Sequence, residues 1–310
     1  MTEKAPRKAA EPATPAEATW KPTAEAKAQS TKLRIIALIL WGVAIALEAV
    51  GIFWLLRQRT VTGGDGELVR NPDTGLLQEQ GAVAEFPQWA FLALIGLLVV
   101  IAALSIIGSL LWKKANRLDP AKKSDTFRFF VQNQLGAIIA IVAFLPLIIL
   151  IFLNKDMSKG QKATAGTIGI ILAAAATVIG IDFNPPSVEK YTADQSTVIQ
   201  LLGEDSVVWV AGGSVYHVCD QVSDIQTGSE KLTGTTAEAV AAGKTRLTLK
   251  FASELRTCGL NVPENADEIE SALREIQNGG TATLPAPVWA NPEDAPIEIP
   301  DAEPAEAPAG

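Results

Sequence analysis

Four long apolar blocks constrain this chain more than any other feature. Three of them contain no charged residue, and the first contains only Glu48. A hydrocarbon core about 30 Å thick needs roughly 20 helical residues to cross it. Each block has that length, and the last three lack the polar stripe of a soluble helix. We therefore predict four transmembrane helices, over residues 35–56, 89–112, 135–153 and 163–181.

The composition agrees with a membrane protein and excludes several other classes. The chain of 310 residues is 48% hydrophobic and only 19% charged, with a formal net charge of −8. It contains two cysteines and one histidine. These values exclude a disulfide-dense secreted scaffold, a basic nucleic-acid-binding protein and a wholly disordered chain.

The fourth predicted span differs from the others because alanine, glycine and threonine dominate it. Small residues allow helix backbones to approach closely, which is how helices associate when lipid supplies no hydrophobic drive. We expect this helix to pack inside the bundle or against a protein partner. The alternative is an ordinary span of low hydrophobicity.

The distribution of lysine and arginine predicts the orientation of the spans. The N-terminal tail and the second loop together carry 13 of these residues, against six in the first and third loops. This asymmetry predicts a cytoplasmic N-terminus, and four spans then return the C-terminus to the cytoplasm. The first apolar block is too long for the core of a cleavable signal peptide, so we expect none.

The segments that flank the spans differ from them in composition and charge. Residues 183–310 carry a net charge of −13, whereas residues 1–182 carry +5. An acidic module favours protein partners with basic patches over nucleic acid, although the acidity can also serve solubility alone. The expected segments are a disordered Ala/Pro/Lys-rich tail (1–34), a linker (183–195), a small acidic α+β domain (196–280) and a disordered acidic Pro-rich tail (281–310).

The domain over residues 196–280 has a predicted element order of β-β-α-β-α. Gly212 and Gly213 separate two β-rich runs and favour a tight hairpin. Thr235 and Glu238 form a capping-box pattern before a short helix. A half-buried strand over residues 245–251 and an amphipathic helix over residues 266–277 complete the domain.

His217, Cys219 and Cys258 form the first candidate site. His217 and Cys219 share one face of a predicted strand, and Cys258 can meet them there. With Asp220 or Asp224, these residues are a candidate zinc set, although the spacing is not that of a known zinc motif. A Cys–His nucleophile pair and a Cys219–Cys258 disulfide are alternatives. The cytoplasmic orientation favours two free thiols beside a structural histidine.

Glu48 is the second candidate because a carboxylate within a span costs several kcal/mol unless it is protonated or paired. A transport role for protons or ions is one interpretation. The other is a hydrogen-bonded residue of the bundle, with Gln132, Asn133 or Gln134 as its partner.

The runs VVWVAGGSVYHVCDQVSDIQ and LTGTTAEAVAAGKTRL resemble a module of uncharacterised actinobacterial multi-span membrane proteins. The similar stretch covers about 45 residues. Some members carry more cysteines near the second half of the module, where this chain has only Cys258. The resemblance implies a membrane or envelope context and no particular activity.

We expect a non-enzymatic accessory or scaffolding subunit of a membrane or envelope complex, with no cofactor. The lipid bilayer is one partner, and the fourth span and the acidic domain are expected to contact protein partners. The chain lacks the phosphate-loop, H-E-x-x-H, G-x-S-x-G and dinucleotide motifs. A small transporter or channel subunit using Glu48 is the second hypothesis. A thiol or metal sensor using His217, Cys219 and Cys258 is the third.

Overall fold

The structure is a computed structural model, and its chain divides into two compact units. It describes residues 19–296 apart from residues 65, 71, 73, 74, 76, 80–82, 223, 224, 226 and 227. The helical unit contains Ala28–Asn116 and Thr126–Phe183. The α+β unit contains the chain up to Lys27, the loop Arg117–Asp125 and the chain from Asn184 onward. Predictions for residues 1–18 and 297–310 lie outside the described residues.

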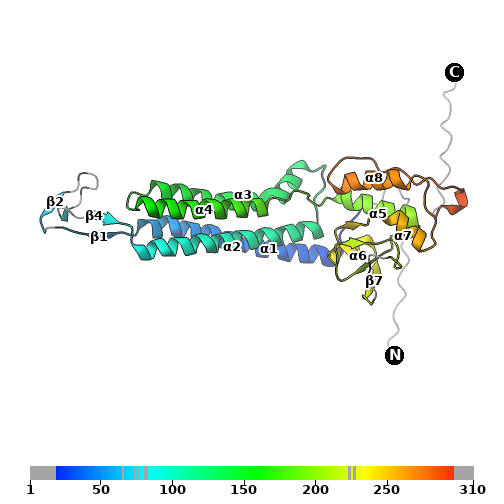
Figure 1. The fold of residues 1–310 in the computed structure, drawn as a ribbon, viewed down its shortest axis with the longest axis horizontal. Coiled ribbons are helices and arrows are strands. Elements are labelled where there is room, and N and C mark those ends of the chain that lie inside the picture. The colour runs from blue at the N-terminus through cyan, green and yellow to red at the C-terminus, as the bar shows by residue number, and fades with distance from the viewer. Residues whose placement is uncertain are drawn as a thin grey trace, which may run out of the picture. The chain divides into compact units, whose positions relative to one another are not determined.

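Four long helices, α1 to α4, run side by side in the helical unit (Figure 1). Each is long and apolar enough to cross a membrane. The prediction of four helices of membrane-spanning length and hydrophobicity is therefore confirmed. The helices are α1 (Ala24–Phe53), α2 (Gln88–Leu118), α3 (Thr126–Leu153) and α4 (Lys159–Gly180).

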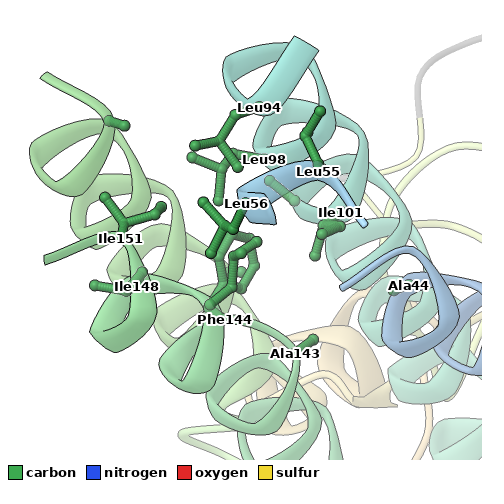
Figure 2. Packing of buried hydrophobic residues seen from close by; sticks show 14 of the residues in the cluster. Ala44, Leu55, Leu56, Leu94, Leu98, Ile101, Ala143, Phe144, Ile148 and Ile151 are labelled. Carbon is green, nitrogen blue, oxygen red and sulfur yellow. The ribbon is translucent and has the colours of Figure 1, made fainter. Parts of the chain in front are cut away.

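The core of the helical unit consists of aliphatic and aromatic side chains from facing helices. Figure 2 shows Leu94 and Leu98 of α2 beside Leu56, with Phe144 of α3 close by. Large apolar residues on the outer faces, such as Leu145 and Ile171, are about half exposed. An apolar exterior around an apolar core is what a helix bundle needs in lipid.

Helices α3 and α4 pack closely because glycines lie at their contact. A Cβ atom on Gly180 would lie 2.6 Å from the backbone nitrogen of Ala137, and one on Gly136 would lie 3.1 Å from the Gly180 carbonyl oxygen. Gly166 and Gly169 face Phe152 and Ile148 in the same manner. The small residues of α4 therefore serve packing within the bundle, one of the two roles expected for them.

The connection between α1 and α2 contains two pairs of short strands. It begins with a 3₁₀ turn, η1 (Leu55–Arg57). Strand β1 (Thr60–Thr62) pairs antiparallel with β4 (Val83–Glu85), and β2 (Leu68–Arg70) pairs antiparallel with β3 (Leu77–Glu79). Alternating Thr and Val favour extended structure, which explains the strands.

The α+β unit has a hydrophobic core of its own, and Figure 1 shows the short helices and strands of this unit. Strand β5 pairs antiparallel with β7, and β6 pairs parallel with β8. Helices α5 and α8 lie in contact. The elements are α5 (Val188–Leu202), β5 (Val207–Val210), β6 (Val215–Tyr216), β7 (Lys231–Gly234), α6 (Thr236–Ala241), β8 (Arg246–Leu247), α7 (Phe251–Thr257), α8 (Ala266–Gln277) and η2 (Pro292–Asp294).

Several local predictions agree with these elements. Helix α8 spans the residues expected for the amphipathic helix. Thr235 and Glu238 form the capping box that opens α6. Val208 and His217 exchange two backbone hydrogen bonds of 2.9 and 2.8 Å, so β5 and the β6 segment approach one another as the predicted hairpin requires.

Other local predictions were wrong. Most of the predicted linker 183–195 belongs to α5, which begins after the N-cap Ser187 and is followed by the C-cap Gly203 in a left-handed conformation. The predicted strand 245–251 is reduced to β8 because α7 begins at Phe251. Phe251 and Leu255, four residues apart, are both buried on the inner face of α7, and this helical spacing competes with the alternating pattern.

The two tails predicted to be disordered are ordered where they are described. Trp20 is buried in the α+β core, and α1 begins at Ala24, well inside the predicted tail 1–34. Leu284 and Trp289 of the predicted tail 281–310 also pack against that core. Each tail is polar in its overall composition, but each contains one tryptophan, Trp20 or Trp289, whose large apolar surface favours burial.

Candidate functional site

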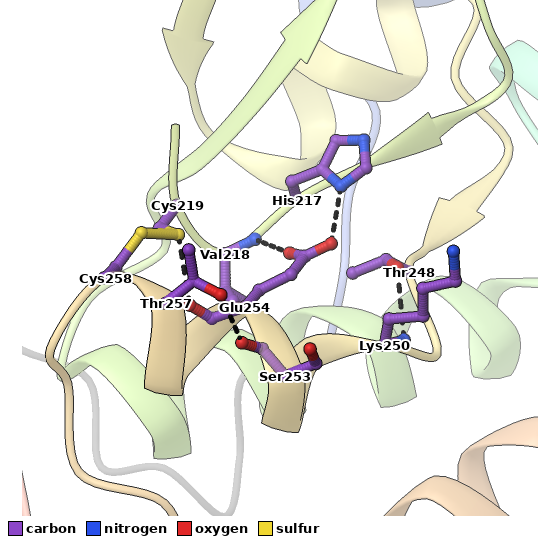
Figure 3. Close-up of polar contacts among 9 residues, drawn as sticks. All are labelled: His217, Val218, Cys219, Thr248, Lys250, Ser253, Glu254, Thr257 and Cys258. Atoms are coloured by element: carbon purple, nitrogen blue, oxygen red, sulfur yellow. Dashed lines mark hydrogen bonds and ion pairs between the residues drawn. A yellow bond between two sulfur atoms is a disulfide. The ribbon is translucent and has the colours of Figure 1, made fainter. Parts of the chain in front are cut away.

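His217 lies beside a carboxylate in the α+β unit (Figure 3). Its Nδ1 atom is 2.7 Å from Oε1 of Glu254 on α7, and both side chains are about 95% buried. Because a carboxylate only accepts, Nδ1 carries the proton of this hydrogen bond. The second carboxylate oxygen of Glu254 accepts the backbone N–H of Val218 at 3.1 Å. Glu254 thus fixes the chain that follows β6 against α7.

A disulfide joins Cys219 to Cys258 next to this pair (Figure 3). The Cα atoms are 6.5 Å apart, within the usual range for a bridge. This differs from the prediction of two free thiols, which rested on the compartment and not on geometry. Sequence could not show that the end of α7 lies against the chain after β6.

The proposed zinc set is not assembled in the structure. Across the described part of the chain, no three His, Cys, Asp or Glu side chains are grouped as metal ligands would be. Asp220 pairs instead with Lys231 at 3.3 Å, and Asp224 lies outside the described residues. With both sulfurs in a bridge and His217 bound to Glu254, these residues support the fold of the unit.

Asp194 on α5 is the most connected buried acid that sequence reasoning missed. Its Oδ2 atom accepts hydrogen bonds from the Tyr216 hydroxyl at 2.7 Å and from the Leu247 N–H at 2.8 Å. Its Oδ1 atom accepts from the Gln277 amide at 2.8 Å. Burial raises the pKa of Asp194 to about 6, against the lowering effect of Gln277 and Tyr216. The carboxyl group thereby links α5, β6, β8 and α8.

Lys244 is a second buried charged residue that no motif indicated. Its side chain is only 2% exposed, and its Nζ atom donates to three consecutive carbonyl oxygens. These belong to Ala211, Gly212 and Gly213, at 3.0 to 3.1 Å. The three donors of an ammonium group match this set, so Lys244 holds the glycine turn after β5.

Three chain segments that are distant in sequence meet in the α+β unit. The N–H of Trp20 donates to Thr192 at 3.1 Å, and the Trp20 ring lies 4.7 Å from that of Tyr191. The Tyr191 hydroxyl donates to the carbonyl oxygen of Arg117 at 3.2 Å. The N–H of Lys123 donates to the Glu189 carboxylate at 2.8 and 3.0 Å. Helix α5 is therefore the common partner of the N-terminal segment and the second loop.

Glu48 is buried in the helical unit, and its Oε1 atom has no hydrogen-bond partner among the described residues. The backbone of Leu147 hydrogen-bonds to its carboxyl group. The predicted partners Gln132, Asn133 and Gln134 lie about 20 Å further along α3, at a rise of roughly 1.5 Å per residue. They do not pair with Glu48, which packs against the middle of the bundle.

Comparison of the chain with protein-family models, with curated proteins and with solved structures finds no match.

Proposed function

We propose that this protein is a non-enzymatic scaffold that holds a protein partner at the membrane. One observation carries the proposal: the α+β unit is built from three separate segments of the chain. The chain passes between this unit and the helical unit four times. A partner bound to such a unit is held at the membrane through four covalent connections.

The outer face of α8 supports a partner of basic character. Its inner residues Ile269 and Leu273 are buried in the core. The solvent side carries Asp267, Glu268 and Glu275, and Arg274 is its one basic residue. Complementary charge steers association and sets specificity more than it sets affinity. We expect a partner with a cluster of lysine or arginine.

Co-purification of the full-length protein from native membranes in a mild detergent tests this function. We expect one stoichiometric partner, released as the salt concentration rises because exposed charge pairs are screened. The variant E268Q/E275Q should retain much less of it. The matched variant E204Q/E230Q removes two exposed acids elsewhere on the unit and should retain it fully. A wild-type protein that purifies alone would contradict the proposal.

The three segments of the α+β unit must share one side of a membrane that the four helices cross. We propose that this side is the cytoplasm, because the excess of lysine and arginine favours it. Cytoplasmic thiols are kept reduced, so we expect Cys219 and Cys258 as a dithiol in growing cells and the disulfide under oxidising conditions. In the dithiol form, the Cys219 thiol has an acceptor available 3.4 Å away, the Glu254 carbonyl oxygen.

A further inference from the structure

Two arginines from different helices line one cavity at an end of the helical unit. Arg34 of α1 and Arg128 of α3 border a space of about 330 Å³. Trp112 of α2 also lines this space, and the Arg34 guanidinium lies 5.9 Å from the centre of its ring. Arginine guanidinium groups bind phosphate well, so two arginines at one cavity are suited to a phosphate group.

The cavity lies where the predicted spans meet the bilayer surface. Arg34 directly precedes the first predicted span, and Trp112 ends the second. Leu135, which begins the third, also lines the cavity. Tryptophan prefers the headgroup level of a bilayer. The Trp112 ring is held there by its Nε1–H, which donates to the Gln132 carbonyl oxygen at 2.7 Å.

The rest of the lining is an apolar track along α3. Phe127, Val131 and Leu135 follow one another at intervals of four residues, which places them on one side of the helix. Eight residues of helix span about 12 Å. The track therefore leads from the level of Arg128 toward the hydrocarbon, in the direction that an acyl chain takes. Free phosphate would leave this surface unused.

From these observations we propose that the cavity binds one anionic phospholipid. Its phosphate lies between Arg34 and Arg128, its headgroup lies beside Trp112, and an acyl chain follows Phe127, Val131 and Leu135. A zwitterionic lipid brings an ammonium group toward the two arginines, so the site discriminates against it. The inference is independent of the scaffold function, because it concerns lipid bound by the helical unit.

Thermal unfolding of the full-length protein in detergent tests the site. Phosphatidylglycerol at saturating concentration should raise the Tm by roughly 5 °C more than phosphatidylcholine does. The variant R34Q/R128Q should lose most of this difference. R57Q is the matched control, because Arg57 lies 6.0 Å from the Phe53 ring and lies outside the lining of this cavity. It should keep the full shift.

Two further measurements test the lipid site even if the variant R34Q/R128Q folds poorly. R34K/R128K retains the charges and should keep more than half of the shift. Native mass spectrometry in an equimolar mixture of the two lipids should find phosphatidylglycerol retained on wild type and R57Q. An equal shift with phosphatidylcholine, or one that persists in R34Q/R128Q, would overturn the proposal. The same shift with inorganic phosphate would assign the site to a free anion and overturn the lipid assignment.

Discussion

Burial and hydrogen bonding act in opposite directions on Asp194. Burial raises the pKa of its carboxyl group from 3.8 to about 6, although Gln277, Tyr216 and the Leu247 N–H all donate to it. Between these two pH values the folded state holds a proton that the unfolded chain releases. The contribution of Asp194 to stability is therefore greatest below pH 4 and falls as the pH rises to 6.

A comparison of wild type with D194N isolates this effect. The difference between their free energies of unfolding should fall by about 2 kcal/mol from pH 4 to pH 7, because each pKa unit corresponds to about 1.4 kcal/mol and part of the effect is already lost at pH 4. Denaturant titration of the purified protein, followed by near-ultraviolet circular dichroism, measures it. E204Q, at an exposed site, should follow the wild-type pH profile. A difference that does not change with pH would refute the assignment.

At the scale of elements, the contact between α3 and α4 depends on glycine. A Cβ atom on Gly180 would lie 2.6 Å from backbone atoms of Gly136 and Ala137, which cannot move as a side chain does. Overpacking of this kind costs about 1 to 3 kcal/mol. G180A should therefore lower the Tm in detergent by several degrees. G42A, where a Cβ meets nothing within 4 Å, should leave the Tm unchanged or raise it, and an equal loss in both variants would contradict this.

The elements that sequence predicted well are those with a local signal. Hydropathy over about 20 residues found all four long helices, and the capping pair Thr235 and Glu238 found α6. Helix α5 was missed because Pro185 and Pro186 lie just before its N-cap, and two consecutive prolines are typical of a linker. Asp194 could not be found, because its partners come from three other elements whose proximity is a result of folding.

For the whole molecule, the side of the membrane can be determined with the two native cysteines. A membrane-permeant maleimide should label Cys219 and Cys258 in growing cells without prior reduction. An impermeant maleimide should label neither, before or after reduction. As a control, T62C in a C219S/C258S background should react with the impermeant reagent, because Thr62 is exposed and the proposed topology places it outside the cell. Labelling of the native cysteines by the impermeant reagent would place the α+β unit outside the cell.

The contact between Trp20 and α5 also sets an order of events during synthesis. The Trp20 N–H and its acceptor on Thr192 are 172 residues apart in the chain. At a translation rate of about 5 to 20 residues per second, Trp20 waits roughly 10 to 30 s for its partner to emerge. All four helices are made in that interval. A chain in which one of the four spans failed to insert would leave Trp20 and α5 on opposite sides of a bilayer. The contact between Trp20 and α5 therefore forms only in a chain with an even number of inserted spans.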